Sequence, residues 1–292
     1  MLPFPSIARS DSRYPASLTN ICEPPDQLFF RGEVFPELLT RPLIAIVGTR
    51  RMTSYGRSVI RQLVPPLVRA GAVIVSGLAL GCDGEAHTIA LDENGSTIAV
   101  LGSGIDNNSL YPRQNFALAQ RIIDSNRGAV ISEFEAGTPS LPHHFPIRNR
   151  IIAGLCAATI VIEAEIKSGS LITAKLALEF GCEVFAVPGP IHAPYSTGTN
   201  YLIQNGAHLL AQASDVLERL ELDVIGPCVK REEDALTASA QTILQNLSEP
   251  RDFDALMEAS KLTPSELMSE LTLLELNGYI IKSDTRWFLK QV

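Results

Sequence analysis

Short, continuous apolar runs alternate with segments of helical apolar spacing between residues 43 and 221. The runs do not alternate apolar with polar residues, which is typical of strands buried on both faces. Strands and helices in this order form right-handed βαβ units, so we expect an α/β fold with a doubly wound, mainly parallel sheet. The expected strands are Leu43–Val47, Ala72–Val75, Thr97–Leu101, Ala129–Ser132, Thr159–Ile162, Glu183–Val187 and Ala207–Leu210, and helical segments include Pro112–Asp124, Asn149–Ala157 and Ser170–Phe180. Pro65 and Pro66 interrupt the first helical pattern, and we expect that helix to end or kink there.

The alternation stops after residue 221, and a different pattern follows. Three short helical patterns, Leu236–Leu247, Asp252–Ala259 and Pro264–Leu276, precede a hairpin pattern, which predicts a small C-terminal winged-helix domain. Thr263 is a suitable N-cap before Pro264, and Gly278 a suitable stop. The predicted parts are a Pro-rich lead-in over 1–42 that packs on the sheet, the sheet domain over 43–221, a linker over 222–235 and the winged helix over 236–292.

The composition excludes several classes of protein. With 292 residues, of which 46% are hydrophobic and 19% charged, the chain has enough apolar mass for about two folded domains and is not disordered as a whole. Its 5 cysteines form no CxxC pair, so we expect neither a disulfide framework nor a metal site. We expect no secretory signal, and the apolar run Ile151–Ile162 is too short to span a membrane. We expect a cytoplasmic protein.

Glycine and serine follow most of the predicted strands. In an open parallel sheet ligands bind beyond the carboxyl ends of the strands, and Gly and Ser at helix starts expose N–H groups to phosphate. Each glycine alone is explained by a tight turn, but the whole set favours a phosphate-bearing ligand. Neither GxGxxG nor GxxxxGK[ST] occurs, so no cofactor is expected. The residues that carry this prediction are Gly48, Thr49, Ser76, Gly77, Gly102, Gly104, Ser168, Gly169 and Ser170.

Charge is unevenly placed along the chain. The net charge of −8 argues against a nucleic-acid ligand, yet residues 38–82 carry arginines and no acid. Arg50 and Arg51 follow the first strand, where a phosphate would lie, and arginine suits phosphate binding. Further candidates are Arg113, Arg148 and Arg150, whereas Arg57, Arg61 and Arg69 are expected on a solvated helix face.

Phe145 stands in the segment Pro-His-His-Phe-Pro, which we expect to be a surface loop. An aromatic ring on a basic surface stacks on single-stranded bases, but a ring folded back into the core is equally compatible with the sequence. No serine lies in a nucleophile motif. Glu133 and Glu163 at strand ends are candidate acids or bases, although capping of loop amides or pairing with Arg148 or Arg150 is favoured.

Several motifs together resemble the bacterial DNA-processing protein A family, DprA, also called Smf. They are GTRRMTSYG, SGLALGCDGEAH, VLGSGIDNNSLYPRQN, ISEFEAGTPSLPHHFPIRNRIIAGL, VIEAEIKSGSLITA, VFAVPG and GTNYLIQNGAHLL, in this order. The resemblance covers about residues 13–220, and FPIRNRIIAGL with SGSLITA is its most specific part.

The resemblance implies a Rossmann-like domain that binds single-stranded DNA and is not an enzyme. Members bind DNA without sequence preference, protect incoming strands in natural transformation, and help load the RecA recombinase onto strands covered by single-strand-binding protein. It also implies a homodimer, with contacts within 200–209 that include Asn200, Ile203 and Leu209. Arg50 would grip phosphate, Arg113 would occupy a basic contact position and Phe145 would stack on a base. The full expected DNA site is Gly48, Thr49, Arg50, Arg51, Ser76, Gly77, Gly102, Gly104, Arg113, Phe145, Arg148, Arg150, Lys167, Ser168, Gly169 and Ser170.

Two departures from the family pattern carry expectations of their own. Pro142 stands where the family often has Lys, which removes a phosphate contact or passes it to His143 or His144. The expected recognition helix, within residues 262–281, has three glutamates and neither Lys nor Arg. A DNA-reading helix should be basic or neutral, so we expect this domain to contact protein and not the major groove.

An enzyme is the competing hypothesis. Rossmann-like nucleotide-processing hydrolases of the phosphoribohydrolase kind also place Gly-rich loops and a carboxylate at the sheet edge, and Glu163 would supply that carboxylate. Their PGGxGTxxE signature is absent, because Pro188-Gly189-Pro190 is followed only distantly by Gly198-Thr199-Asn200. A transcription regulator is disfavoured by the acidic recognition helix.

Overall fold

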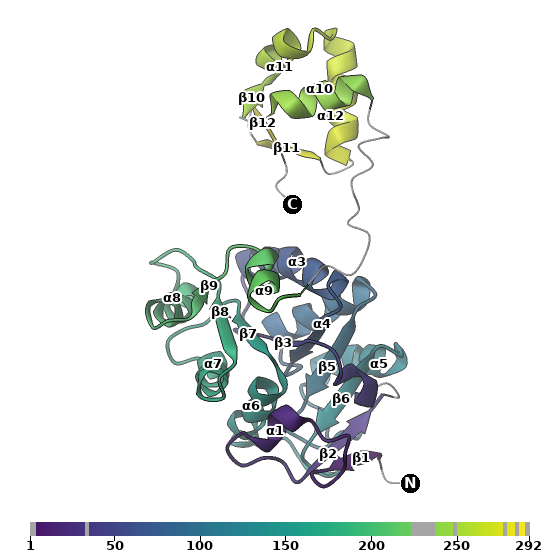
Figure 1. The fold of residues 1–292 in the computed structure, drawn as a ribbon, viewed down its shortest axis with the longest axis vertical. Coiled ribbons are helices and arrows are strands. Elements are labelled where there is room, and N and C mark those ends of the chain that lie inside the picture. Colours follow the sequence, from purple (N-terminus) through teal and green to yellow (C-terminus); the bar gives the residue numbers. More distant parts are fainter. Residues whose placement is uncertain are drawn as a thin grey trace. The chain divides into compact units, whose positions relative to one another are not determined.

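The continuous apolar runs form the parallel part of one large sheet. The computed structural model describes residues 4–32, 35–222, 237–247, 250–276, 279–283 and 286–289. Within them the sheet order is β1-β2-β6-β5-β4-β3-β7-β8-β9, parallel from β6 to β9 and antiparallel at β1 and β2 (Figure 1). The predicted mainly parallel sheet is confirmed. The strands are β1 (Ser6–Ala8), β2 (Gln27–Arg31), β3 (Leu43–Val47), β4 (Val73–Ser76), β5 (Ser96–Val100), β6 (Gly128–Ser132), β7 (Ala158–Val161), β8 (Glu183–Ala186) and β9 (His208–Leu209).

Both faces of this sheet are buried. Along β3, Ala45 and Val47 belong to one hydrophobic core, and Ile44 and Ile46 belong to a second core. Successive side chains of a strand point to opposite faces, which explains why the runs show no polar alternation. The first core includes side chains of α1, α6, α7 and α8, and the second includes side chains of α3, α4 and α9. The helices are α1 (Ala16–Thr19), α2 (Phe35–Leu38), α3 (Ser54–Arg69), α4 (Cys82–Asp92), α5 (Phe116–Asp124), α6 (His144–Leu155), α7 (Gly169–Glu179), α8 (Thr197–Gln204) and α9 (Ala213–Arg219), with short 3-10 turns η1 (Arg113–Asn115) and η2 (Pro194–Ser196).

Helix α3 runs through both of its prolines, so of the two expectations, an end or a kink, the end is wrong. Thr53 caps the helix by accepting a hydrogen bond from the Gly56 N–H. Beyond the prolines, Leu67 and Val68 are buried in the second core. A proline removes one helical hydrogen bond near the end of the helix, and the burial of apolar side chains outweighs that loss.

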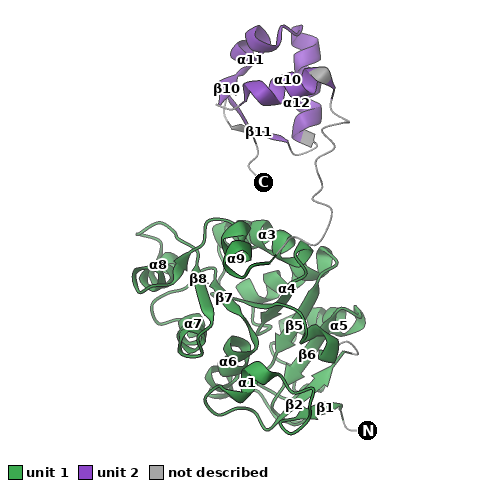
Figure 2. Ribbon diagram, in the orientation of Figure 1, with its two compact units in different colours: residues 1–226 green, residues 227–292 purple. Residues whose placement is uncertain are grey.

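The chain divides into two compact units, Met1–Gly226 and Pro227–Val292 (Figure 2). The predicted lead-in over 1–42 contributes β1 and β2, which extend the sheet next to β6. Of the predicted linker over 222–235, all residues but Leu222 lie outside the described part of the chain.

The second unit has its own core and the predicted winged-helix make-up. Leu256, Leu271 and the buried Trp287 are among the residues of this core. Thr263 and Glu266 form a reciprocal cap at the start of α12, because each accepts a hydrogen bond from the main-chain N–H of the other. The helices are α10 (Ala238–Asn246), α11 (Phe253–Ser260) and α12 (Pro264–Leu276), and the strands are β10 (Arg251–Asp252), β11 (Ile280–Ser283) and β12 (Arg286–Leu289), in the order β10-β12-β11.

Candidate nucleic-acid interface

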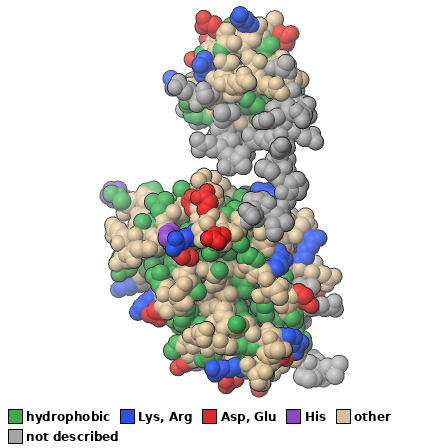
Figure 3. Space-filling model, in the orientation of Figure 1, with side chains coloured by type: hydrophobic (Ala, Val, Ile, Leu, Met, Phe, Trp, Pro, Cys, Tyr) green, Lys and Arg blue, Asp and Glu red, His purple; other side chains and the backbone are tan. Residues whose placement is uncertain are grey.

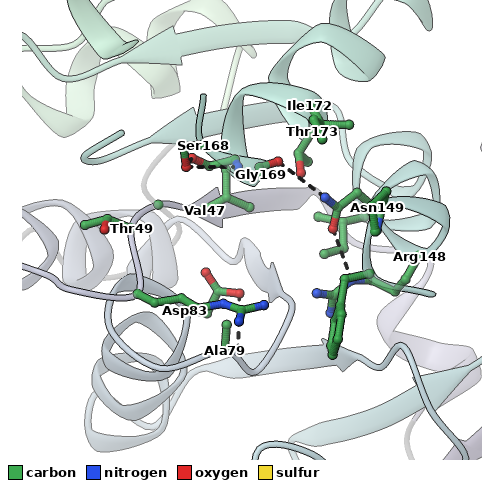
Figure 4. A pocket seen from close by; sticks show the side chains of 16 residues that line it. Val47, Thr49, Ala79, Asp83, Arg148, Asn149, Ser168, Gly169, Ile172 and Thr173 are labelled. Carbon is green, nitrogen blue, oxygen red and sulfur yellow. Dashed lines mark hydrogen bonds between the residues drawn. The ribbon is translucent and has the colours of Figure 1, made fainter. Parts of the chain in front are cut away.

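A pocket of about 260 Å³ opens at the carboxyl ends of the central strands. Strand β3 lies between β4 and β7, and the helices that follow β3 and β7 pack on opposite faces of the sheet, so the strand order reverses here. Ligands bind at such switch points. We call this the switch-point pocket (Figure 4). It is lined by Val47, Gly48, Thr49, Arg50, Ala79, Asp83, Phe145, Pro146, Arg148, Asn149, Ile152, Ser168, Gly169, Ser170, Ile172 and Thr173.

Arg50 and Phe145 stand together in the wall of this pocket. The guanidinium carbon of Arg50 lies 5.4 Å from the centre of the Phe145 ring, which is a cation–π contact. Phe145 is half-buried and lies in the first turn of α6, so the prediction of a loop is wrong there. Gly102 leaves room for the ring, because an added Cβ would lie 3.3 Å from its Cδ1 atom. The positive charge can bind a phosphate, and the ring beside the open cavity can stack on a base.

Arg148 supplies a buried positive charge at the pocket, with only 5% of its surface exposed. Its guanidinium donates hydrogen bonds to the carbonyls of Gly77, at 2.8 Å, and Val100, and its Nε donates to Asn149 Oδ1. Gly77 leaves room for this guanidinium, which an added Cβ would overlap. Burial lowers the pKa of Arg148 to about 10, so the group is still charged at neutral pH.

Asp83 lies beside this arginine and holds the loop after β4. Its Oδ2 accepts hydrogen bonds from the main-chain N–H groups of Gly77, at 3.1 Å, and Ala79, at 3.4 Å. Burial raises the pKa of Asp83, while the neighbouring Arg148 acts in the opposite direction. Figure 4 shows Asp83 next to Ala79, and Arg148 next to Asn149.

The N-terminus of α7 forms the opposite wall. Ser168 caps this helix by accepting a hydrogen bond from the Ser170 N–H, and the Asn149 side-chain amide donates to the carbonyl of Gly169 at 3.4 Å. Free N–H groups in the first turn of a helix attract anions. The predicted residues Gly48, Thr49, Arg50, Phe145, Arg148, Ser168, Gly169 and Ser170 are thus brought together.

Three predicted arginines lie outside the lining of the pocket. Arg51 is exposed on the loop next to it. Arg113 donates hydrogen bonds to the carbonyls of Asn107 and Asn108. Arg150 forms an ion pair with Glu133 at 2.6 Å, which confirms the structural role favoured for that glutamate.

Other predicted contact residues have positions that the fold itself explains. Ser76 is fully buried and donates a hydrogen bond to the carbonyl of Ile46. An added Cβ at Gly104 would overlap the carbonyl of Glu135, so this glycine serves close packing. Lys167 is exposed and does not line the pocket. Arg57 and Arg61 pair with Glu85, and Arg69 pairs with Glu93, on the solvated face expected for them.

The two histidines beside Pro142 differ in their surroundings. His144 is buried, stacks on Phe134 with 4.2 Å between ring centres, and contacts the Gly102 carbonyl. It therefore cannot replace the lysine that Pro142 displaces. His143 is exposed.

The sequence reasoning missed the residues that share a helix face with Phe145. Phe145, Arg148, Asn149 and Ile152 all line the pocket, at the spacing i, i+3, i+4 and i+7 of one helix face. The predicted helix began at Asn149, so Phe145 and Arg148 were not recognised as part of the same helix face. A helix beginning at His144 would have placed Asn149 and Ile152 in the site.

Comparison with known proteins shows the family. The family described as DNA recombination-mediator protein A matches residues 6–221, most of the chain. The chain belongs to this family. A second family model, described as the DprA winged helix domain, matches residues 230–283. The resemblance inferred from the motifs is confirmed.

Relatives within the DNA recombination-mediator protein A family cover most of the chain. "DNA processing protein DprA" of Streptococcus pneumoniae is 44% identical over 75% of both chains. "Protein Smf" of Escherichia coli is 38% identical over 91% of this chain and 72% of its own length. The solved structure of the S. pneumoniae protein has a TM-score of 0.68 at 42% identity and covers 75% of both chains.

A second solved structure, DNA processing protein A from Helicobacter pylori, has a TM-score of 0.65 at 31% identity. It covers 75% of this chain and 96% of its own, and its description concerns its single-stranded DNA binding mode.

The residues expected at the dimer contact lie at one end of the sheet. Leu209, in the edge strand β9, is 52% exposed. Ile203 packs partly against the first core, and the Asn200 amide exchanges hydrogen bonds with Gly189, at 3.2 and 3.0 Å. Among the described residues, none of the helices is long and apolar enough to cross a membrane, and there is no cluster of metal-ligating side chains.

Proposed function

We propose that this chain binds single-stranded DNA without sequence preference and acts as a recombination mediator. In this role it protects incoming strands in natural transformation and homologous recombination and helps load a RecA-type recombinase onto strands covered by single-strand-binding protein. The observation that carries the proposal is the Arg50–Phe145 pair at the switch-point pocket. The binding mode described for the H. pylori relative supports it.

The make-up of the pocket favours single strands of any sequence. A pocket of about 260 Å³ can receive a part of one strand, whereas a duplex keeps its bases paired and stacked. Stacking on Phe145 is sequence-tolerant because every base has a π-face. The charges of Arg50 and Arg148 and the N–H groups of α7 attract phosphate, which carries no sequence information.

We propose a binding role and not a catalytic one. Glu163, the carboxylate candidate of the competing hypothesis, is buried and accepts hydrogen bonds from the N–H and hydroxyl of Thr53, and it does not line the pocket. Asp83 accepts hydrogen bonds from main-chain amides of the loop after β4. Incubation with nucleoside monophosphates tests the alternative: base release that Glu163→Gln abolishes would establish the hydrolase instead.

Arg50→Ala tests the proposed site. We expect the affinity for single-stranded DNA to fall by about 1–2 kcal/mol, roughly 5- to 30-fold, and equally for every sequence, because a phosphate contact is lost. The salt dependence should also become shallower by about one unit of slope. The measurement is a gel shift titrated over salt concentration, with single-stranded and duplex DNA compared.

Arg69→Ala is the matched control for this experiment. It removes the same charge, but Arg69 pairs with Glu93 and lies outside the switch-point pocket. Both variants would weaken binding alike if only the total charge mattered. Wild-type affinity in Arg50→Ala would remove Arg50 from the site.

A further inference from the structure

A second, smaller cavity adjoins the switch-point pocket. We call it the Tyr111 slot. It measures about 30 Å³. Arg50, Ala79, Phe145 and Arg148 line both cavities and therefore form a common wall. The lining of the Tyr111 slot is Arg50, Gly77, Ala79, Leu80, Tyr111, Pro112, Phe145 and Arg148.

Tyr111 carries an exposed ring on an anchored backbone. Its side chain is 43% exposed, whereas its neighbour Leu110 is buried in the core. Four residues on, the Asn115 amide donates hydrogen bonds to the carbonyls of Leu78 and Ala79, at 2.8 and 3.0 Å. These bonds tie the segment to the loop that lines the slot. The fold thus anchors the backbone that carries the ring without burying the ring.

The rings of Tyr111 and Phe145 are near each other but not stacked. Their centres are 5.8 Å apart and their planes are inclined by 51°. The separation is short enough for adjacent nucleotides of an extended strand to reach one ring each. A slot of about 30 Å³ is too small to enclose a base, so a base would rest on the exposed ring of Tyr111. The exposed side chain of Leu80 adds apolar surface beside it.

We propose that Tyr111 is a second base-stacking residue, which receives the nucleotide next to the one held by Phe145 on the same DNA strand. The ligand is any nucleobase, because a stacking ring contacts no base edge. Arg50, in the common wall, would contact the phosphate between the two nucleotides. The inference rests on the proposed function and extends its site from one nucleotide to two. The competing explanation is that Tyr111 only supports the Phe145 ring.

The test uses oligothymidylate with a single 2-aminopurine placed at successive positions, because stacking quenches its fluorescence. Two neighbouring positions should be quenched by the wild-type chain. Tyr111→Ala should abolish quenching at one of them and Phe145→Ala at the other. Tyr111→Ala should also lower affinity about 5- to 100-fold, whereas Tyr111→Phe should keep wild-type binding. Since no phosphate contact is lost, the salt slope of Tyr111→Ala should equal that of the wild type.

Leu178→Ala is the control, because it removes a 45%-exposed apolar side chain that lines neither cavity. It should bind as the wild type does. Loss of quenching at both positions in Tyr111→Ala would show that Tyr111 merely supports Phe145, and unchanged binding would also overturn the inference. In either case the proposed function stands. A wild-type chain that fails to bind single-stranded DNA would overturn both.

Discussion

His87 is a buried histidine near enough to Arg148 for that charge to affect it, and it links the stability of the first unit to pH. It is fully buried, and its Nδ1 lies 2.6 Å from the Thr97 hydroxyl. Within the described residues its Nε2 has no hydrogen-bond partner. Burial, with a smaller effect of Arg148, lowers the pKa of His87 from 6.5 to about 3. The folded chain therefore keeps this imidazole neutral in a pH range where the unfolded chain binds a proton.

The sign of the pH dependence follows from this depressed pKa. Below pH 6.5 the unfolded state binds more protons at His87, so the free energy of unfolding falls progressively as the pH falls toward 3. Between pH 7 and pH 5 the loss should be about 2 kcal/mol. Urea unfolding at both pH values, for the wild type and His87→Leu, measures it. The raised pKa of Asp83 acts in the opposite direction in both proteins, so their difference isolates His87.

His87→Leu is a suitable comparison because it leaves no new donor unpaired. The Thr97 hydroxyl also donates a hydrogen bond to the Ile74 carbonyl, at 2.7 Å. Equal pH dependence in the variant and the wild type would show that His87 is not the group responsible.

At the scale of one element, helix α12 differs in charge from the arginine-lined pocket of the first unit. Its surface carries the exposed apolar side chains of Met268 and Leu273, at 49% and 53%, beside Glu266 and Glu275. Duplex DNA repels carboxylates, so this helix should not enter the major groove. Exposed apolar side chains among carboxylates instead suit contact with a protein.

Removal of residues 227–292 tests this expectation. Among the described residues the cores of the two units have none in common, so the first unit should fold without the second. We expect gel shifts of the full chain and of residues 1–226 to give affinities within about twofold of each other on duplex DNA at physiological salt. A large loss of duplex binding on truncation would contradict the charge argument.

At the scale of the whole molecule, the proposed DNA site is local. The net charge is −8, and on the face shown in Figure 3 basic and acidic side chains are interspersed and form no single basic patch. Screening at physiological salt confines charge effects to about 8 Å, so arginines at the pocket act there in spite of the net charge. Steep salt dependence of binding is therefore compatible with an acidic protein.

The proposed homodimer is also a matter of the whole molecule, because it depends on the free edge of the sheet. Leu209 lies exposed in the edge strand β9, and burying a leucine stabilises an interface by about 1.5–3 kcal/mol. We expect Leu209→Glu to weaken self-association at least tenfold, because a carboxylate would be buried there. Sedimentation equilibrium measures this. Met268→Glu, on the second unit, should associate as the wild type does, and a dimer unchanged by Leu209→Glu would place the contact elsewhere.

The sequence by itself determined the sheet, the winged helix and the loops that meet at the switch point. A continuous apolar run such as Leu43–Val47 keeps all its side chains out of water only when both faces of the strand are buried. The order of strands and helices then determines which loops lie at the same edge of the sheet. Arg50 and the Ser168 cap follow from that rule alone.

Only the tertiary structure decided which charged and aromatic side chains face the pocket. Arg148 and Arg150 are two residues apart on α6 and therefore point in different directions, one to the loop after β4 and the other to Glu133. The position of the Tyr111 segment likewise involves Asn115, whose amide reaches a loop far away in the chain. Contacts between distant segments depend on helix register and packing, which a local pattern of residues does not specify.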